Sequence, residues 1–358
     1  MKKVILFVLT IGFVFNLPAE NIRPVRDDIG YCWNAQQMDR FMDYLKSSYT
    51  SDTNKDKQET GKRPLFIAGI SPHDDYLYAG RVYYPLFKNI TAREVVIFGV
   101  THSTPRKKIG DPQNKIIFDS YDYWKGPYKN VKVSKLREFL KETLDPEMYI
   151  TNNEAHRLEH SIEGMVPFLQ YFNREVKITP IMVTGMPFDT MDILAGKLAA
   201  VLGSYLKENH LKVGRDIFFL ISADANHYGK AFNNTVYGED QKAHELGTAR
   251  DKKIAYSFLN GEMTGEKIRG LTSELWGKTY RDYKDTVWCG KYSIPFGMLT
   301  VLHLMKKGTG KKLTGKILLY SDTYTEGVIP LKKPGFGITA PFSLKHWVGF
   351  FSTTFYSD

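Results

Sequence analysis

Cysteine is scarce in this sequence, and so are long apolar runs. The 358 residues include two cysteines, Cys32 and Cys289, which are too few for a disulfide scaffold. An exported chain could still join them in one disulfide bond. Apart from a short apolar run near the amino terminus, no stretch approaches the length of a membrane span. These absences exclude a small disulfide-rich protein and a protein that crosses the membrane several times.

Several catalytic signatures are also absent. The sequence has no Gly-x-Gly-x-x-Gly loop, no P-loop, no Gly-x-Ser-x-Gly elbow and no His-Glu-x-x-His pattern. The first two bind nucleotides, the third carries the nucleophile of many serine hydrolases, and the fourth binds zinc in metalloproteases. Nucleotide-dependent chemistry and the standard serine-hydrolase arrangement therefore have no support in the sequence.

Positive charge is in excess but is not concentrated. The chain has 49 Lys and Arg against 39 Asp and Glu, a net charge of +10. The positive residues fall in short scattered clusters, such as residues 106–108 and 306–307, and no stripe interleaves them with aromatic residues. This pattern predicts a solvated basic surface that attracts anions weakly, and no nucleic-acid partner.

The first nineteen residues differ from the rest of the chain. A positive start at residues 1–3 is followed by an apolar run from Val4 to Phe15 and then by polar and small residues up to Ala19. This order is typical of a secretory signal peptide, and the apolar run is too short to span a bilayer comfortably. We therefore expect residues 1–19 to be a signal peptide and 20–358 the domain. The chain would then be exported, periplasmic or secreted, without stable membrane insertion after cleavage. An uncleaved membrane anchor is the alternative.

Strand and helix patterns alternate along the remaining chain. Buried strands are predicted at 65–70, 95–100 and 217–221, and helical spacing at 80–90 lies between the first two. Further helices are predicted at 133–144, 154–172, 190–206, 240–259 and 294–305, and further strands at 176–184 and 315–320. Pro180 makes the strand at 176–184 irregular or places it at a sheet edge. The pattern predicts one α/β domain with a central, mostly parallel sheet flanked by helices.

Histidines follow three of the predicted strands. His73 comes directly after the first strand, His102 after the second, and Asp224 and His227 after the strand at 217–221. The carboxyl ends of parallel strands meet at one edge of a sheet, where function gathers. Histidine is the commonest transition-metal ligand, and a carboxylate or thiolate can complete such a site. Three histidines at one edge favour a metal site over ordinary hydrogen-bonded residues.

The segment 154–163 supplies further candidates. If it is helical, His156 and His160 lie four residues apart on one face. A direct metal-ligand role for His156 is one interpretation, and a structural role is the other. For His160 we expect a place beside the ligands or facing the substrate, where it could donate a hydrogen bond or transfer a proton. Asp224 could likewise orient a ring or act as acid or base, or it could be an ordinary turn residue.

Five segments, in order along residues 71 to about 300, resemble motifs of the Memo family. The stretch around His73, SPHDDYLYAG, resembles the family's PHAGYxYSG, and FGVTHS around His102 resembles LGPxH. EHSIE with the later PFL, SADANHYG and Cys289-Gly290 before Pro295 resemble EHSIE…PFL, SSDxxHYG and CG…P. The chain departs from the pattern at Asp74 and Asp75, which replace Ala-Gly, and at Val100, which replaces Pro.

This resemblance implies a fold similar to the class III extradiol dioxygenases. It implies His73, His102 and Cys289 as metal ligands, with iron or copper as the metal and zinc less favoured. Carried over by motif, the candidate catalytic residues His160, Asp224 and His227 line the same cavity. Bacterial and archaeal members are called the B component of the AmmeMemoRadiSam system, so proteins of that system are expected partners. A eukaryotic member is described as binding phosphotyrosine peptides.

Three functions stay open on the sequence. The first is a metal-dependent, dioxygenase-like oxidoreductase of unknown substrate, because Fe(II) with few protein ligands keeps positions open for oxygen and substrate. The second is a non-catalytic module that binds a small molecule or peptide and retains a vestigial metal site. The third is a metal-assisted hydrolase, in which the ion activates water. As a metal ligand Cys289 would be a thiolate, free of Cys32, and a bond between the two cysteines would remove it from the site.

Overall fold

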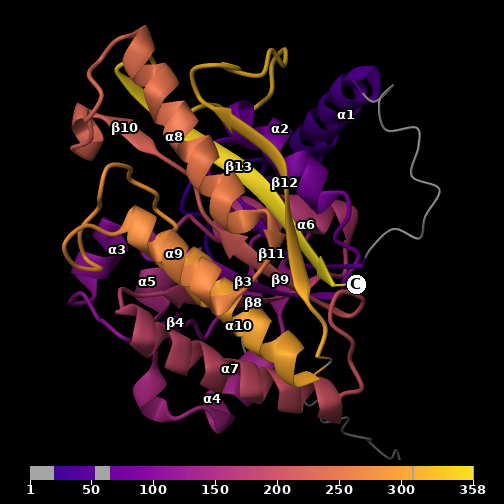
Figure 1. The fold of residues 1–358 in the computed structure, drawn as a ribbon. Helices are drawn as coiled ribbons and strands as arrows, with labels where there is room; N and C mark the ends of the chain where they lie inside the picture. Colours follow the sequence, from indigo (N-terminus) through magenta and orange to yellow (C-terminus); the bar gives the residue numbers. More distant parts are fainter. Residues whose placement is uncertain (1–19, 53–64, 309, 358) are drawn as a thin grey trace, which may run out of the picture.

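A mixed sheet runs through the centre of the computed structural model, which describes residues 20–52, 65–308 and 310–357 (Figure 1). Its middle is parallel, and its carboxyl-terminal strands join antiparallel to the first core strand. In spatial order the strands are β1 (Ile22–Arg23), β5 (Tyr123–Trp124), β6 (Val131–Val133), β8 (Lys177–Val183), β3 (Glu94–Val100), β9 (Ile217–Ser222), β2 (Phe66–Ser71), β13 (His346–Ser357), β12 (Leu313–Asp322) and β11 (Gly261–Glu262). Beside this path, β4 (Ile116–Phe118) pairs with β7 (Tyr149–Thr151) and β8, and β10 (His227–Gly229) pairs with β13.

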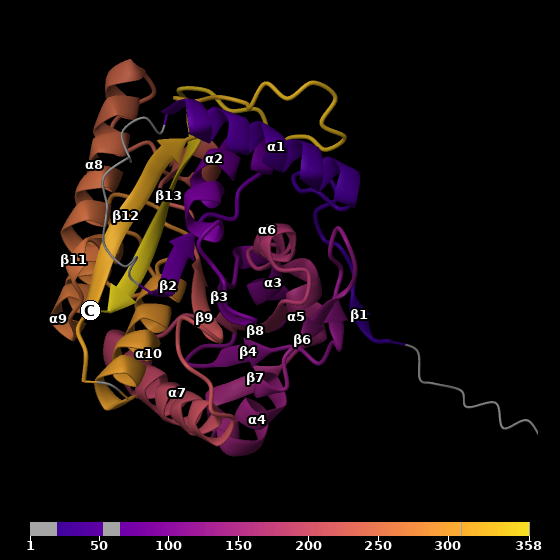
Figure 2. The ribbon, with the colours of Figure 1, turned by 90° about the vertical axis from the view of Figure 1, so that its right-hand side faces the viewer.

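Helices cover both faces of the sheet (Figure 2). One face carries α7 (Phe188–Glu208), α8 (Gln241–Leu259), α9 (Gly265–Leu275) and α10 (Ser293–Gly308), with α4 (Leu136–Thr143) against α7. The other carries α1 (Ala35–Asp52), α2 (Tyr76–Phe87) and α6 (Val166–Phe172). The shorter helices are α3 (Ser103–Lys108) and α5 (Asn153–Leu158), and the 3₁₀ turns are η2 (Pro146–Met148), η3 (Glu163–Met165) and η4 (Lys230–Phe232).

The central strands are apolar on both sides because each side faces its own core. In β3, Val96 and Phe98 pack in the core under α7 to α10, while Val95 and Ile97 pack in the core under α1, α2 and α6. This alternation follows from the two-residue period of a strand. Strands buried on both faces are typical of parallel sheets covered by helices. The predicted α/β class and the predicted core strands are therefore confirmed.

The continuous helix predicted over residues 154–172 is wrong. The chain forms α5, then the turn η3, then α6. At Glu159 the backbone is extended, with φ −93° and ψ 139°, and the Glu159 carboxylate accepts hydrogen bonds from the N–H groups of His160 and Ser161. Those donors would otherwise bond to helical carbonyl groups. Pro167 lies in the first turn of α6, where a missing N–H costs nothing.

The strand with Pro180 lies inside the sheet, so of the two predicted alternatives the position at an edge is wrong. Pro180 is in register with Ile97 of β3 on one side. The carbonyl of Ile178 points to the other side, where it accepts from Ser134 N–H, and Pro180 points the same way because strand residues alternate. On that side β6 ends its pairing at Ile178 and β4 begins at Met182. The missing amide proton therefore faces a gap between two short partners.

The signal peptide predicted for residues 1–19 lies outside the described residues. Within the described ranges, none of the helices combines the length and the apolar character that a membrane span needs. Both cysteines are free thiols: Cys32 is buried in the core and Cys289 is partly buried. The alternative in which they form a disulfide is therefore not realised.

Candidate metal centre

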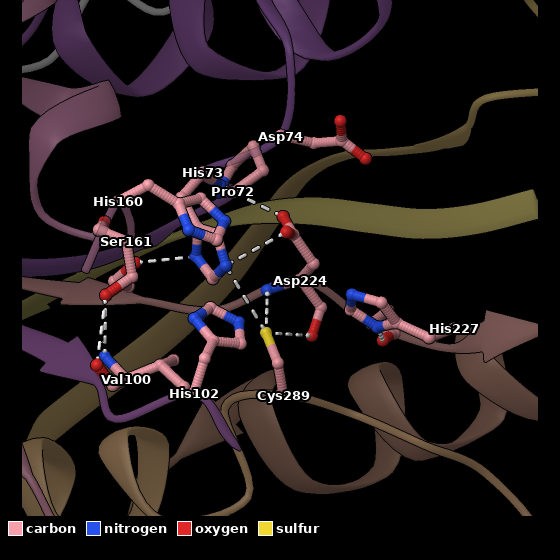
Figure 3. A network of polar contacts seen from close by, with 12 residues as sticks. Pro72, His73, Asp74, Val100, His102, His160, Ser161, Asp224, His227 and Cys289 are labelled. Carbon is pink, nitrogen blue, oxygen red and sulfur yellow. Dashed lines mark hydrogen bonds and ion pairs between the residues drawn. The ribbon is translucent and has the colours of Figure 1, made fainter. Parts of the chain in front are cut away.

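Three neighbouring parallel strands deliver the candidate ligands to one edge of the sheet. His73 follows β2 and His102 follows β3. Asp224 and His227 come after β9, which lies between β2 and β3 in the sheet. Cys289 comes from the loop between α9 and α10. One nitrogen of each ring of His73 and His102 and the sulfur of Cys289 lie within 4.8 Å of one another. Figure 3 shows the rings and the sulfur pointing toward the same space.

The His73 ring is fixed by its inner nitrogen. Nδ1 lies 2.8 Å from the hydroxyl oxygen of Ser222, and that hydroxyl donates its only proton to the carbonyl of Ser161 at 2.7 Å. Nδ1 of His73 must therefore be the donor, which leaves the lone pair of Nε2 directed into the site. Burial lowers the pKa of His73 well below its usual value, and the neighbouring rings of His102 and His160 add to this effect. The ring is thus neutral, as a metal ligand must be.

The His102 ring is fixed in the same sense by Glu159. Its Nδ1 lies 2.7 Å from Glu159 Oε1, and its backbone N–H donates to Oε2 at 2.8 Å. Burial alone would raise the pKa of Glu159, but the charge and hydrogen bonds of His102 lower it well below the usual range. The carboxylate is therefore ionised and holds the proton of His102 on Nδ1. Nε2 is the nitrogen that faces the site. Although burial opposes it, Glu159 raises the pKa of His102, so Nε2 must release a proton before it can bind a metal in the arrangement common in metal-ligating histidines.

Cys289 reaches the centre because its loop packs tightly on the end of β9. A Cβ atom at Gly290 would lie 2.3 Å from the Cβ atom of Ala223, so the close approach needs glycine here. The sulfur of Cys289 accepts a hydrogen bond from Asp224 N–H at 3.1 Å and lies 3.6 Å from His73 Nε2. Burial raises the pKa of the thiol, and Asp224 raises it further. The sulfur is therefore protonated unless a cation lies beside it.

Asp224 lies at the same nitrogen of His73 as the Cys289 sulfur. Its Oδ1 accepts from His73 N–H at 3.0 Å, and its Oδ2 lies 3.2 Å from His73 Nε2. Burial raises the pKa of Asp224 to about 7. Since Nε2 of His73 carries no proton, this short contact requires either a proton on Asp224 or a positive ion between the two groups. The residue is well placed to hold and release a proton beside the site.

The other predicted residues divide into two groups. His160 stacks on His102 with ring centroids 4.7 Å apart, and His227 lines the cavity with Nδ1 3.1 Å from two backbone carbonyl groups. Burial and the His102 charge lower the pKa of each to about 4, so both rings are neutral near pH 7. His156 lies elsewhere: it is buried against Trp124 and donates from Nε2 to the carbonyl of Ile117. The interpretation of His156 as a ligand has no support in this geometry.

The comparisons with known proteins identify a family for this chain. The model of the family described as "Memo-like protein" matches residues 30–327 of the chain. This chain belongs to the Memo-like family. A MEMO1 family protein of Pyrococcus horikoshii is 28% identical over 235 residues, covering 62% of this chain and 75% of the relative. One of Aquifex aeolicus is 33% identical over 191 residues, covering 49% and 63%. One of Sulfurisphaera tokodaii is 28% identical over 275 residues, covering 74% and 80%.

In this Memo-like chain, sequence reasoning missed the residue that holds the His160 segment from the amino-terminal side. Arg23 is almost fully buried in the structure. It forms an ion pair with Glu163 and donates to the backbone carbonyls of His156 and Glu159, at 2.9 and 2.6 Å. No local pattern marks this contact, because Arg23 lies more than 130 positions away from its partners along the chain.

A second missed residue of the Memo-like chain is Asp251 on α8. Its carboxylate accepts from Trp288 Nε1 at 2.8 Å, Asn226 N–H at 3.1 Å, Tyr320 OH at 2.9 Å and Thr286 OH at 3.2 Å. Asn226 lies between Asp224 and His227, and Trp288 precedes Cys289. One buried carboxylate therefore ties together the two loops that bring these groups to the centre.

Proposed function

We propose that this chain is a metal-dependent, dioxygenase-like oxidoreductase in which His73, His102 and Cys289 hold one iron or copper ion. The observation that carries the proposal is the orientation of the two rings. Each turns a proton-bearing Nδ1 outward to a fixed acceptor and its Nε2 inward, next to a sulfur and the Asp224 carboxyl. Two ring nitrogens, a sulfur and a carboxyl oxygen that converge on one space become a set of metal ligands when they release their protons, so the arrangement fits a cation.

The donor set favours a transition metal of intermediate or soft character. Two imidazoles and a thiolate suit iron, copper or zinc, and do not suit Mg²⁺ or Ca²⁺, which prefer oxygen ligands. Three protein ligands leave positions open for small molecules. A bound Fe(II) or Cu ion would supply the electron transfer to oxygen that no side chain of this site can supply.

The residues around the ligands can bind and release protons. Asp224 Oδ2 can hold a proton near neutral pH, because its pKa is about 7. The neutral His227 ring donates from Nδ1 to backbone carbonyls, so its Nε2 is an acceptor in the cavity wall. His160 is neutral as well, and its stacking on His102 keeps it beside the same space. These three groups give the site proton donors and acceptors for a substrate that changes its charge.

Elemental analysis of protein purified without oxygen tests the proposal. We expect about one iron or copper per chain in the wild type, and loss of that metal in His73→Ala. His303→Ala is the matched control, because His303 pairs with Asp192 and belongs to none of the candidate ligand groups. Oxygen consumption with catechols or thiols then tests the redox activity.

Other results would contradict the proposal in distinct ways. Wild-type protein that binds no metal while its cavity stays intact would show that the proposed metal centre does not exist. His73→Ala protein with the metal content of the wild type would show that His73 does not hold the metal. Equal affinity for a ligand with and without metal would favour a binding module. Activity with zinc but with neither iron nor copper would favour a hydrolase.

A further inference from the structure

The cavity beside the centre extends well beyond the candidate ligands. Its volume is about 350 Å³, and it reaches from His102, His227 and Cys289 to α3 on one side and to the segment 281–292 on the other. This volume is at the lower end of the range for small-molecule sites. Three cationic side chains line it, Arg106, Arg281 and Lys291, and no Asp or Glu is among the described residues of its lining.

Lys291 is the most unusual of these cations. The residue is 3% exposed, and within the described chain no carboxylate forms an ion pair with it. Its ammonium group donates to the backbone carbonyls of Arg281 and Asp282, at 2.7 and 3.2 Å, and lies 3.9 Å from the centre of the Tyr283 ring. Burying a charge is costly unless an opposite charge compensates it. Carbonyl dipoles and a ring face fix the position of Lys291, and the carboxylate of Asp282 acts on its charge without forming an ion pair with it.

The other two cations surround the same space. Arg281 lies at the exposed mouth, where its Nε is 3.3 Å from the Tyr280 hydroxyl and no ion pair is formed with the described residues. Arg106 comes from α3, on the His102 side, and its Nε lies 3.0 Å from Asp111 Oδ1. One of the three positive charges is thus paired with a carboxylate, and the other two belong to lining residues that form no ion pair within the described chain. Such a wall attracts an anion without rearrangement of the protein.

Aromatic rings line the same cavity as the cations and the sulfur. The Tyr292 hydroxyl donates to the backbone carbonyl of Tyr280 at 2.6 Å, which holds its ring in place. The Phe232 ring packs edge-on against His227, with centroids 5.0 Å apart. Tyr283, Tyr292 and Phe232 all belong to the lining. A ligand between them needs an apolar body as well as a charged end.

We infer that the cavity binds a small organic anion, with its charged group against Arg106, Arg281 and Lys291 and its apolar body against the tyrosine rings, directed toward Cys289. The inference rests on the proposed function only for the reacting end of the ligand. Recognition of the charged end depends on protein side chains alone and is therefore expected in metal-free protein too.

Fluorine NMR of the full chain in EDTA tests the inference with two probes of similar shape. 4-Fluorobenzoate carries the negative charge, and 4-fluorobenzyl alcohol lacks it. We expect the benzoate to bind at least about tenfold more tightly than the alcohol, and Lys291→Met to remove most of that preference, because one charge-assisted contact contributes about a factor of ten. Arg281→Gln, at an exposed position, is expected to weaken benzoate binding in the same direction without affecting folding.

Lys252→Met is the matched control, because Lys252 lies on α8 over the Tyr320 ring and does not line the cavity. It should leave the preference for benzoate unchanged. Equal binding of the two probes, or an equal loss in Lys252→Met and Lys291→Met, would overturn the inference. A chain that binds no metal but prefers benzoate would contradict the proposed function and keep the inference. A chain that binds metal but does not distinguish the two probes would contradict the inference and leave the proposed function standing.

Discussion

The imidazole side of the centre, His73 and His102, is held by side chains that bond to the rings, whereas the sulfur side, Cys289, is held by backbone contacts at the end of β9 and by a carboxylate on α8. Ser222 at the end of β9 and Glu159 beside β3 fix the two rings directly. The Cys289 loop is anchored instead through Trp288, which bonds to Asp251 on α8. The rings are therefore oriented by side chains that touch them. The sulfur accepts a hydrogen bond from one backbone N–H, that of Asp224, and the carboxylate of Asp251 supports its loop through Trp288.

This difference predicts unequal sensitivity of metal binding to the supporting residues. The largest effect is expected from Glu159→Gln. The substitution keeps the size of the side chain but replaces one oxygen by an NH₂ group, which would face an N–H group of His102, His160 or Ser161. Loss of such a partner weakens metal affinity by about 10–100-fold. Competition with a coloured zinc chelator measures this affinity.

Glu154→Gln is the control for that variant. Glu154 lies five residues earlier, on the exposed face of α5, where it pairs with Arg157. We expect its replacement to leave zinc affinity unchanged. If Glu159→Gln bound zinc as tightly as the wild type, the ring of His102 would not depend on this carboxylate, and the proposed contrast between the two sides would fail.

The same contrast explains which parts of the molecule the sequence predicts. The strands at 65–70, 95–100 and 217–221 are recognisable because each is a continuous apolar run buried on both faces, and His73, His102 and Asp224 follow directly from where they end. The sheet edge is thus encoded locally. The break at Glu159 is not, because the apolar spacing around it suits a helix and only the side chain's own hydrogen bonds interrupt it.

Long-range contacts account for what the sequence leaves out. The strand β13, which pairs with β2 and β12, lies at the far end of the chain, and nothing in its composition predicts its place beside the first core strand. Asp251 looks like any polar residue of an amphipathic helix, and Lys291 like any surface lysine. Their burial depends on how α8 and the loop before α10 pack on the sheet. Tertiary packing decides whether these two residues are buried, and the periodicity of the sequence does not indicate it.

A smaller effect on metal binding is expected from Asp251→Asn. The amide would present an NH₂ group to one of the four donors that now bond to the carboxylate. One of the hydrogen bonds that connect the loops of Asn226 and Trp288 through Asp251 would then be weakened or lost. Because Asp251 touches no ligand atom, we expect a loss of about tenfold in affinity, at the low end for supporting residues. Absorption of the Co(II)-substituted protein reports the sulfur side directly, and its thiolate-to-cobalt band should shift or weaken.

Asp322→Asn separates positioning from general stability. Asp322 is a buried carboxylate on β12 that bonds to His244 and to the turn after the strand, and it contacts neither loop of the centre. We expect this variant to lose stability but to keep the cobalt band of the wild type. A band that is unchanged in Asp251→Asn, or equally disturbed in Asp322→Asn, would show that Asp251 does not position the sulfur.

The smallest effect concerns Asp224, which lies between the two sides. Burial raises its pKa to about 7 from an ordinary value of 3.8, so between these pH values the folded, metal-free chain holds a proton that the unfolded chain has released. The free energy of unfolding must then fall as pH rises through this window. Asn cannot lose a proton, so Asp224→Asn should gain stability relative to the wild type between pH 4 and pH 7. We expect a gain on the order of 1 kcal/mol, because Asp74 repels Asp224 and shares the shift.

Urea unfolding in EDTA at several pH values measures this gain, with the exposed Asp43→Asn as a control that should show no such trend. Saturating zinc should abolish the difference or reverse it, because a cation beside His73 and Cys289 stabilises the carboxylate and not the amide. A gain that is the same at pH 4 and pH 7 would mean that Asp224 does not carry the proton. Equal trends with and without zinc would mean that no cation lies close to it, and the sulfur and imidazole sides would then enclose no ion.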